Sequence, residues 1–559
     1  MRSVSLTLLS LVSYALASPL TKRASGVTTD ASQANAHSFD YIVVGAGLTG
    51  TTVAARLAED SGVTVLLIEA GADNRDDSRV YDIYAYSQAF GTELDWSWST
   101  DEGKTIHGGK TLGGSSSING GHYTRGLDAQ FDAWSSLLEE NESDMGWNWE
   151  GMLNYMKKSE AFSAPNGQQS AKGAQFDGDY HGYDGPVQVT YPDEMYGGPQ
   201  QGDFVNTIVN LTGIYHSPDI NGGGANAVSI TPFTINWHDD DHRSSSVQAY
   251  LSPVEGVRTN WLTLAEHQVT KINWANAGSI PLTASGVEFA PTSGGLLRYF
   301  NFLESATLMS WDPLGIDTYI DLKTVGKNLQ EQYLVMKRQA SVSKIQSSLS
   351  SWASSQASSA LSADALEEIY SIQADLIINQ NAWLLQFAPL ALTFLRSPLG
   401  IDQWQLLPFS RGTVQISTTD PFTQPTINVN YFSVDWDLDV QIASARLSRT
   451  ILTSPPLSDL STGETIPGNS VPDDSDRGSE DDWRSWITNG FAAVSHPIGT
   501  LAMMKRSLGG VVDSQLKVYD TSNVRVVDAS IVPLHISAHL AAGLYGVAEK
   551  AADLIKASY

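Results

Sequence analysis

The chain has 559 residues, of which 42% are hydrophobic and 9% aromatic, the balance of a globular protein with one large core or several. Its formal net charge is -28 at pH 7. Such an acidic surface repels phosphate backbones and anionic membranes, so we expect neither a nucleic acid nor a membrane partner. The sequence contains no cysteine, which excludes disulfide bonds and leaves stability to core packing.

The amino-terminal residues 1–23 predict a secretory signal peptide. Arg2 is followed by a short apolar run and by the small-residue sequence Ala15-Leu16-Ala17, and Lys22-Arg23 would suit a second, dibasic cut that releases a propeptide. The apolar run is too short to span a membrane. We therefore expect a secreted, extracellular protein, and the glycosylation sequons that begin at Asn141 and Asn210 are compatible with a glycoprotein.

The first strong motif is a glycine-rich turn between two apolar runs. The stretch "FDYIVVGAGLTGTTVAARLAEDSGVTVLLIEAG" predicts a strand ending at Val44, a turn with Gly45, Gly47 and Gly50, an amphipathic helix, and a second strand ending at Glu69. Glycines in such a turn let the backbone approach a pyrophosphate, whose charge lies at the amino end of the helix. Glu69 lies 19 residues past Gly50, close to the spacing of a carboxylate that binds a ribose hydroxyl. This order of elements predicts a dinucleotide site.

A second glycine-rich stretch bears on which dinucleotide binds. The first motif alone is used for both NAD and FAD. The stretch "GGKTLGGSSSINGGHYTRG" runs from Gly108 to Gly126, and its small residues offer backbone N–H groups and hydroxyls without bulk, which suits a large cofactor. Ile118 and Tyr123 within it indicate packed structure rather than a flexible linker. The second stretch therefore favours FAD.

The motifs together resemble the glucose-methanol-choline (GMC) family of FAD-dependent oxidoreductases. The resemblance rests on the two glycine-rich stretches and on the final "SHPIGTLAMM...GGVVDSQLKVY...NVRVVDASIVP...SAHL", with support from "WQLLPFSRGTVQIS" and "VGKNLQEQ". Within the family the chain is most similar to the fungal glucose oxidase and FAD-glucose dehydrogenase branch. The motifs run from about residue 39 to 557 and so cover nearly all of the chain beyond the leader.

The resemblance implies an α/β fold in which a Rossmann-like FAD-binding domain and an α+β substrate-binding domain are built from discontinuous segments. The FAD-binding domain would comprise residues 38–160, 241–340 and 485–559, and the substrate-binding domain residues 161–240 and 341–484. We expect strands and loops from about residue 160 to 240. We expect helices in the Ser-rich tract "SSLSSWASSQASSALS", with the serines on a solvated face, and in "ADALEEIYSIQADLII".

Carried over by position, the resemblance implies cofactor contacts throughout the chain. Leu48, Thr49 and Glu69 would contact the adenosine and pyrophosphate half of FAD, and Val269 would lie on the adenine side. The positions that match the middle and the flavin end of the cofactor are Ser115, Asn119, Gly120, Asp528 and Ala541.

His496 and His539, 43 residues apart, match the active-site pair of the family. Oxidation of an alcohol removes a hydroxyl proton and moves a hydride from the carbinol carbon to flavin N5. Histidine, with an ordinary pKa of about 6.5, can accept that proton near neutral pH. We expect His496 to be the base and His539 to orient the hydroxyl; once protonated, the pair would stabilise negative charge on the reduced flavin. His535, which could share a helix face with His539, is expected to be structural.

Two departures from the family pattern qualify the resemblance. Between Arg298 and Pro313 the sequence lacks the second family signature, a strand and a following helix, and we expect this loss to leave a gap beside FAD. Ala492 and Val494 stand where glucose-acting relatives carry an Arg and an Asn that bind sugar hydroxyls. Because such a site loses discrimination when its hydrogen bonds are removed, we expect a different sugar or a less polar primary alcohol rather than glucose.

Three functional hypotheses follow. The leading one is a secreted FAD-dependent oxidoreductase that acts on the CH–OH group of a sugar or alcohol and passes its electrons to oxygen or to a quinone-like compound. The second is an NAD(P)-linked dehydrogenase, disfavoured by the second glycine-rich stretch and by secretion. The third is a flavin-free binding protein, or pseudoenzyme, whose cofactor domain lacks the missing segment. We expect no metal site, because the acids and histidines of "HDDDH" at 238–242 are typical of a solvated loop.

Overall fold

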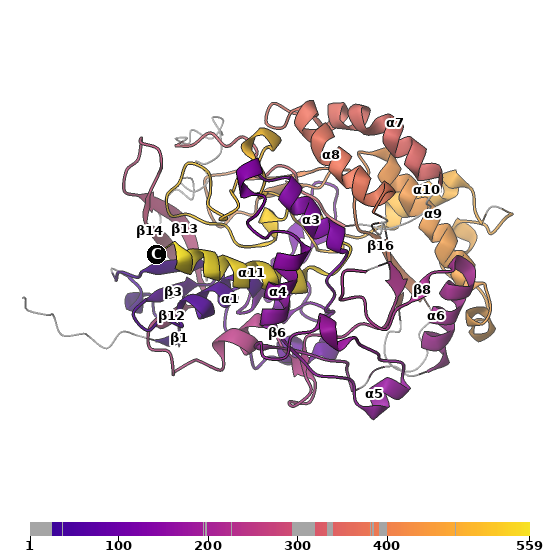
Figure 1. Ribbon diagram of the computed structural model, residues 1–559, viewed down its shortest axis with the longest axis horizontal. Coiled ribbons are helices and arrows are strands. Elements are labelled where there is room, and N and C mark those ends of the chain that lie inside the picture. Colours follow the sequence, from indigo (N-terminus) through magenta and orange to yellow (C-terminus); the bar gives the residue numbers. More distant parts are fainter. Residues whose placement is uncertain are drawn as a thin grey trace, which may run out of the picture.

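The computed structural model describes residues 25–35, 37–193, 195, 198–224, 226–292, 319–332, 339–380, 382, 385–390, 400–475 and 477–558 (Figure 1). Its helices are α1 (Leu48–Leu57), α2 (Ser78–Tyr81), α3 (Asp128–Ser136), α4 (Trp149–Ser159), α5 (Gly167–Ala171), α6 (Pro199–Thr212), α7 (Gln339–Gln356), α8 (Ala363–Ile378), α9 (Asp435–Leu452), α10 (Glu480–Gly490) and α11 (Leu540–Ala557). Its strands are β1 (Gly26–Thr28), β2 (Tyr41–Val44), β3 (Val65–Ile68), β4 (Trp98–Ser99), β5 (Thr105–Ile106), β6 (Glu160–Phe162), β7 (Val187–Val189), β8 (Tyr215–His216), β9 (Ala227–Val228), β10 (Ile235–Asn236), β11 (His242–Arg243), β12 (Trp261–Leu264), β13 (His267–Trp274), β14 (Ala284–Pro291), β15 (Leu385–Leu390), β16 (Gly400–Gln405), β17 (Thr413–Gln415) and β18 (Thr426–Asn428).

A four-stranded parallel sheet carries the first glycine-rich turn. Its strand order is β1-β12-β3-β2, and β3 lies in its interior with all four side chains buried. Helix α1 connects β2 to β3, and Val53, Ala54 and Leu57 on this helix are buried in the core. The predicted strand-turn-helix-strand unit is therefore confirmed: the first strand ends at Val44 as expected, and the second ends one residue before Glu69.

The last helix packs against elements from the first third of the chain. Helix α11 lies beside α1 and α4, so the carboxyl-terminal segment covers the sheet near the glycine-rich turn (Figure 1). Arg56 of α1 forms an ion pair with Glu549 of α11, whose other oxygen accepts a hydrogen bond of 2.8 Å from the Tyr250 hydroxyl. Segments far apart in sequence thus build one body around the sheet.

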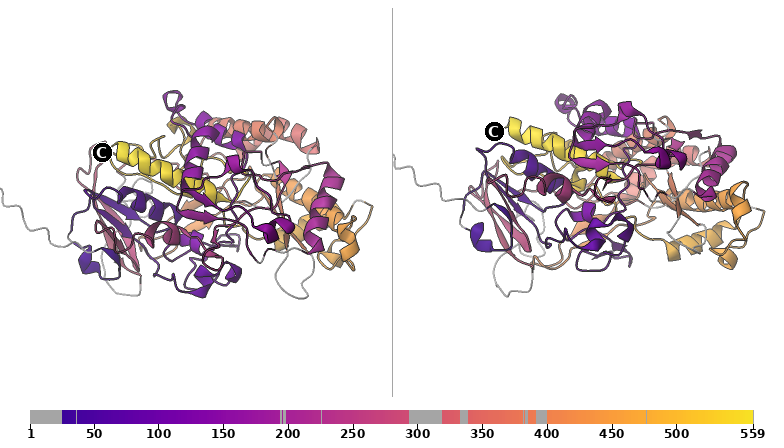
Figure 2. Two further views of the ribbon diagram at one scale, coloured as in Figure 1. Left: turned by 60° about the horizontal axis from the view of Figure 1, so that its bottom comes forward. Right: turned by 90° about the horizontal axis from the view of Figure 1, so that it is seen from below.

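Helices α6 to α10 gather at the opposite end of the molecule from the parallel sheet (Figure 2). Both helices expected between residues 347 and 378 are present as α7 and α8. Ile345 and Trp352 of α7 are buried while Ser350 and Ser351 are exposed, which confirms a solvated serine face. No helix in the described part of the chain is both long and apolar enough to cross a bilayer.

The prediction of only strands and loops between residues 160 and 240 was wrong, because this region contains α5 and the 14-residue helix α6. Helix α6 begins with Pro199 in its first turn and ends at Gly213 in the left-handed conformation, both ordinary helix boundary signals. Phe204 and Ile208, one turn apart, are buried. Packing of this apolar face outweighs the low intrinsic helix propensity of the valines, threonines and isoleucine in the segment.

Strand β2 forms an edge of the sheet as built from the described residues. Its alternate side chains Ile42 and Val44 are 37% and 56% exposed. Natural sheets usually cover or charge such an apolar edge. The segment between Arg298 and Pro313, where the family signature is missing, lies outside the described residues.

Candidate active site

The first glycine-rich turn leaves open space at the amino end of α1. A Cβ atom added to Gly45 or Gly47 would meet no atom within 4 Å, whereas one added to Gly50 would lie 2.0 Å from the Gly45 carbonyl oxygen. Gly50 thus permits close packing of helix and turn, and Gly45 adopts a φ of +89°, which favours glycine. No side chain caps Gly47 at the start of α1, so the amides of Leu48 and Thr49 lie at an uncapped helix terminus.

Glu69 lies at the carboxyl end of β3, beside this turn. Its carboxylate accepts hydrogen bonds of 2.7 Å from the backbone N–H groups of Ala46 and Gly71, and the side chain is 6% exposed. Burial raises the pKa of Glu69, while these two N–H groups and the charge of Lys110 act in the opposite direction. In the structure Glu69 fixes the turn to the strand end; the ribose contact expected from spacing stays a prediction.

The second glycine-rich stretch folds onto the first. Gly113 N–H donates to the Ala46 carbonyl at 2.7 Å, and a Cβ added to Gly114 would lie 2.7 Å from the Gly47 Cα. Ser115 follows directly, and its hydroxyl accepts a hydrogen bond of 3.2 Å from Gly109 N–H. The two stretches therefore form one wall, as expected for residues that share a ligand.

The remaining predicted cofactor positions are spread around this wall. Asn119 is held by Arg243, which donates to both its backbone and its side-chain oxygen, and Gly120 faces the Tyr86 ring. Val269 of β13 packs beside β3 and β12 in a small apolar cluster. Asp528 caps a short turn through the Ser530 N–H, and Ala541 lies in the first turn of α11. Their contacts with a cofactor stay predictions.

His496 and His539 lie together, although they come from different segments. Their ring centroids are 5.9 Å apart and their planes make an angle of 86°, an edge-to-face arrangement. His496 is in the loop that follows α10, and His539 is the residue that precedes the first turn of α11. The fold thus unites the two histidines that the sequence singled out.

The protonation of the His496 ring follows from Gln332. His496 Nδ1 is 2.8 Å from Gln332 Oε1, and Gln332 Nε2 donates to the Ile536 carbonyl at 3.2 Å. Because the Gln332 amide nitrogen donates to the Ile536 carbonyl, the amide oxygen faces the ring and accepts a hydrogen bond from His496 Nδ1–H. The neutral ring therefore carries its proton on Nδ1 and presents a free lone pair on Nε2.

His539 has the opposite arrangement because of Thr124. The Thr124 hydroxyl oxygen accepts a hydrogen bond of 2.9 Å from His539 N–H and lies 3.1 Å from His539 Nδ1. Having accepted from the backbone, the hydroxyl can donate its own hydrogen to Nδ1. With that donation the neutral ring carries its proton on Nε2, and the contact is then compatible with one acceptor and one donor nitrogen in the site.

Both rings are neutral near neutral pH. Burial lowers the pKa of His496 to about 4. Burial, followed by the neighbouring His122 and His496, lowers the pKa of His539 well below its ordinary value. The position of His539 at the amino end of α11 acts in the same direction, because the helix dipole disfavours positive charge there.

Sequence reasoning missed several residues of this site. Gln332 and Thr124 lie within quoted motifs, "VGKNLQEQ" and "HYTRG", but nothing local reveals their histidine partners. His122 stacks on His539 at 4.8 Å and Trp404 meets it edge-on at 5.8 Å. His535 is 1% exposed and lies 3.3 Å from the Gln330 carbonyl; it precedes α11 and so shares no helix face with His539.

Comparisons with known proteins assign the family. GMC oxidoreductase models match residues 39–332 and 408–548. The glucose oxidase-like protein fsoC of Humicola fuscoatra is 35% identical, with 93% of this chain and 95% of the relative covered. The chain belongs to the GMC oxidoreductase family. A glucose oxidase of Aspergillus carbonarius is 32% identical over 98% of each chain, and the solved structure of a FAD-dependent oxidoreductase from Chaetomium thermophilum is similar with a TM-score of 0.80, 26% identity and coverage of 93% and 99%.

Membership of the GMC family makes this chain a FAD-dependent oxidoreductase that acts on CH–OH donors. The residues present fit the cofactor. Open space at Gly45 and Gly47, beside the uncapped amino end of α1, suits a pyrophosphate. No cluster of described residues could hold a metal ion.

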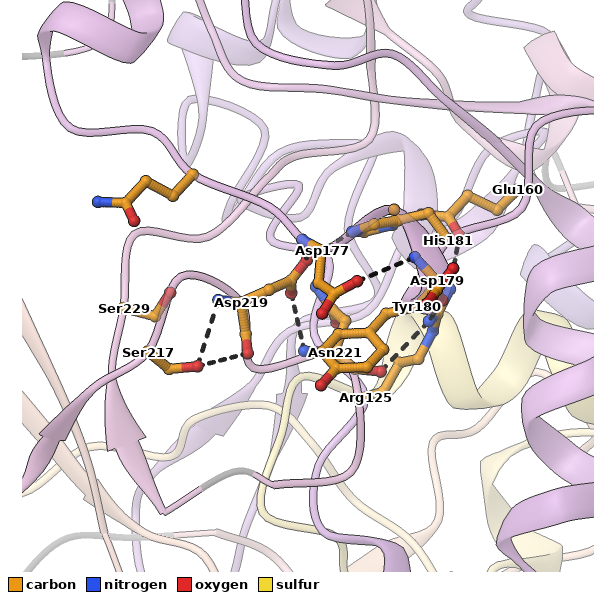
Figure 3. Close-up of polar contacts among 12 residues, drawn as sticks. Arg125, Glu160, Asp177, Asp179, Tyr180, His181, Ser217, Asp219, Asn221 and Ser229 are labelled. Atoms are coloured by element: carbon orange, nitrogen blue, oxygen red, sulfur yellow. Dashed lines mark hydrogen bonds and ion pairs between the residues drawn. The ribbon is translucent and has the colours of Figure 1, made fainter.

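Arg125, which follows Thr124 in the sequence, belongs to a buried network of charged side chains (Figure 3). Arg125 donates to Glu160 at 2.5 Å, Glu160 contacts His181 Nδ1 at 2.7 Å, and His181 Nε2 contacts Asp219 at 2.7 Å. All four side chains are at most 6% exposed. Since each nitrogen of His181 faces a carboxylate, the doubly protonated ring satisfies both, and two cations then balance two anions.

Replacement of His181 by glutamine tests this charge balance. Burial alone lowers the pKa of His181, but its bonds to Asp219 and Glu160 outweigh burial, so the pKa lies above the ordinary value. Because the pKa of His181 is higher in the folded protein than in the unfolded chain, protonation of His181 stabilises the fold. This stabilisation is complete below about pH 6.5 and is lost as the pH rises through the pKa of the folded protein. We expect His181→Gln to lower the melting temperature by about 5 °C at pH 6, with a smaller difference at alkaline pH. Thermal unfolding of both proteins between pH 6 and 9 measures this; a constant difference would contradict a charged His181.

Proposed function

We propose that this GMC oxidoreductase is a secreted enzyme that oxidises the CH–OH group of a sugar or alcohol, with His496 as the base and His539 as the residue that orients the substrate hydroxyl. The observation that supports it best is that the two histidine rings lie edge-to-face, each with its Nδ1 held by a different polar partner. In this proposal His496 Nε2 is the acceptor and His539 Nε2 the donor, and the ring centroids are 5.9 Å apart. One hydroxyl group placed between them can donate to the first and accept from the second.

This arrangement serves alcohol oxidation directly. The His539 Nε2–H holds the substrate oxygen, and the His496 lone pair takes the hydroxyl proton as the carbinol carbon loses its hydride. When bound, FAD supplies the two-electron acceptor that receives this hydride. Gln332 keeps the His496 proton on Nδ1 throughout, so Nε2 is ready for the next proton, and the low pKa of His496 favours its later release to solvent.

The cofactor would lie along the wall formed by the two glycine-rich stretches. In this proposal the Rossmann-like FAD-binding domain comprises residues 38–160, 241–340 and 485–559, and the other segments form the substrate-binding domain. The amides of Leu48 and Thr49 would bind the pyrophosphate at the uncapped start of α1, and Glu69 and Val269 would contact the adenosine half. The residues assigned to the middle and flavin half are Ser115, Asn119, Gly120, Asp528 and Ala541.

The substrate is proposed to be a sugar other than glucose or a less polar primary alcohol. Ala492 and Val494 precede His496 in its loop and carry no hydrogen-bonding side chain. The relatives named as glucose oxidases support a CH–OH donor, but hydrogen bonds that hold several sugar hydroxyls cannot come from these two positions. Oxygen or a quinone-like compound would accept the electrons.

The visible absorption spectrum of the purified secreted protein tests the proposal. We expect flavin bands that bleach when sugars and primary alcohols are added without oxygen, and the substrates that bleach them fastest identify the substrate class. A colourless protein that gains no bands with added FAD would support a flavin-free binding protein instead. Bands that no alcohol or sugar bleaches would contradict the proposed reaction while leaving the cofactor in place.

A further inference from the structure

The residue before His496 has an unusual backbone conformation. Ser495 has a φ of +67°, in the left-handed region that L-residues other than glycine and asparagine rarely adopt. Pro497 follows His496 and restricts its backbone to extended conformations. The direction of the His496 side chain therefore depends on whether Ser495 stays in its left-handed turn.

A buried carboxyl group lies at this turn. Glu331 is 1% exposed, and its Oε1 accepts a hydrogen bond of 2.9 Å from the His496 N–H. Burial raises the pKa of Glu331 to about 8, against the lowering effect of backbone N–H groups of His496, Gln332, Ser495 and Val494. The amides of residues 494 to 496 thus lie toward one carboxyl group, and the His496 N–H makes the hydrogen bond to it. A left-handed residue is what turns successive N–H groups toward a single acceptor.

The Ser495 side chain is held from the other side. Its hydroxyl accepts a hydrogen bond of 2.9 Å from the His107 N–H, and His107 Nδ1 lies 2.6 Å from the buried carboxylate of Asp95. Glu331 precedes Gln332, which fixes the His496 ring. One residue of this dipeptide therefore contacts the backbone of the histidine and the next contacts its side chain.

We propose that Glu331 is a positioning residue: as a buried acceptor for the amide that follows Ser495, it holds the left-handed turn that directs His496 at the substrate. The inference rests on the proposed role of His496 as base. Glu331 touches neither substrate nor cofactor in this role. It acts as a hydrogen-bond acceptor, so a neutral amide at the same position keeps the function, and glycine at 495 removes the need for it, because glycine adopts a positive φ without steric cost.

Four variants of the full-length, FAD-loaded protein test this inference by the rate of anaerobic flavin reduction at saturating substrate. We expect Glu331→Leu to slow reduction by about tenfold to a hundredfold, the scale of a misplaced catalytic group, with substrate affinity within about threefold of the parent. Glu331→Gln should stay within about threefold of the parent. The double variant Glu331→Leu/Ser495→Gly should regain about fivefold or more over Glu331→Leu. Ser495→Val, in which β-branching disfavours the left-handed turn, should be slow although Glu331 is present.

Flavin content and melting temperature show whether each variant is folded, and Glu102→Leu is the matched control. Glu102 also accepts a backbone hydrogen bond, of 2.6 Å, from Asn430, whose φ is +61°, but it is exposed. Reduction at the parent rate in Glu331→Leu, no gain in the double variant, or a Glu331→Gln as slow as Glu331→Leu would each overturn the inference. If His496→Ala itself reduces its flavin at the parent rate, the proposed base is wrong, whatever Glu331 does.

Discussion

Replacement of His496 by alanine is expected to leave FAD bound and to slow flavin reduction by the best substrate by about a hundredfold or more, the usual scale for a lost general base. The backbone N–H of residue 496 can still donate its hydrogen bond to Glu331 in this variant, so the loop keeps this contact. What disappears is the Nε2 lone pair that Gln332 keeps available. Stopped-flow reduction without oxygen, with the substrate in excess, measures the rate directly.

The pH dependence of the same rate identifies the group that is lost. Since the pKa of His496 is lowered to about 4, the parent rate should stay level down to about pH 5 and fall below it as a proton occupies Nε2. This fall of the rate at acid pH should be missing in His496→Ala. Replacement of the exposed His238 by alanine is the control and should leave both the reduction rate and its fall at acid pH unchanged. A variant at position 496 that keeps the parent rate would show that another group takes the proton.

The parts of the site that could be predicted from the sequence are those whose signals are local. Gly45, Gly47 and Gly50 lie within six residues of one another. Gly45 and Gly47 leave open space and Gly50 allows close packing of the helix on the turn, and both effects involve only neighbouring residues. The helices α7 and α8 were predictable for the same reason, because a repeating apolar face is a local property. Helix α6 was not predicted, because its β-branched residues have low intrinsic helix propensity and the helix is stabilised by packing that the local sequence does not show.

The tuning of the histidine pair could not be predicted, because it depends on contacts across the chain. Gln332 lies 164 residues from His496, and Thr124 lies 415 residues from His539. Only packing of α11 against the first third of the chain brings Thr124 to the second ring. The sequence alone does not show which polar groups contact the two rings. The two different partners, an amide for one ring and a hydroxyl for the other, are what supports the separate roles proposed for them.

Valine at position 47 is expected to abolish FAD binding while the protein still folds. Gly47 has a φ of -72° and a ψ of -169°, an extended conformation that any residue adopts, and an added Cβ meets no protein atom within 4 Å. The fold therefore does not need glycine here. The proposed pyrophosphate position does, because a branched side chain at the uncapped start of α1 would occupy the space where the backbone N–H groups are exposed. We expect the purified Gly47→Val protein to be colourless, with FAD affinity lowered by about a hundredfold or more, on the order of 3 kcal/mol.

The comparison that isolates this effect is Gly167→Val. Gly167 also begins a helix, α5, and an added Cβ there meets nothing within 4 Å, but it lies away from both glycine-rich stretches and is exposed. This variant should keep its flavin bands and the parent melting temperature in the presence of FAD. Circular dichroism should show the same helix content in both variants, because an added Cβ meets no atom within 4 Å at either position. A yellow Gly47→Val protein would place the cofactor phosphates elsewhere than at α1. A colourless one that also loses its helix content would mean that the turn itself requires glycine, in contradiction to the open space at its Cα.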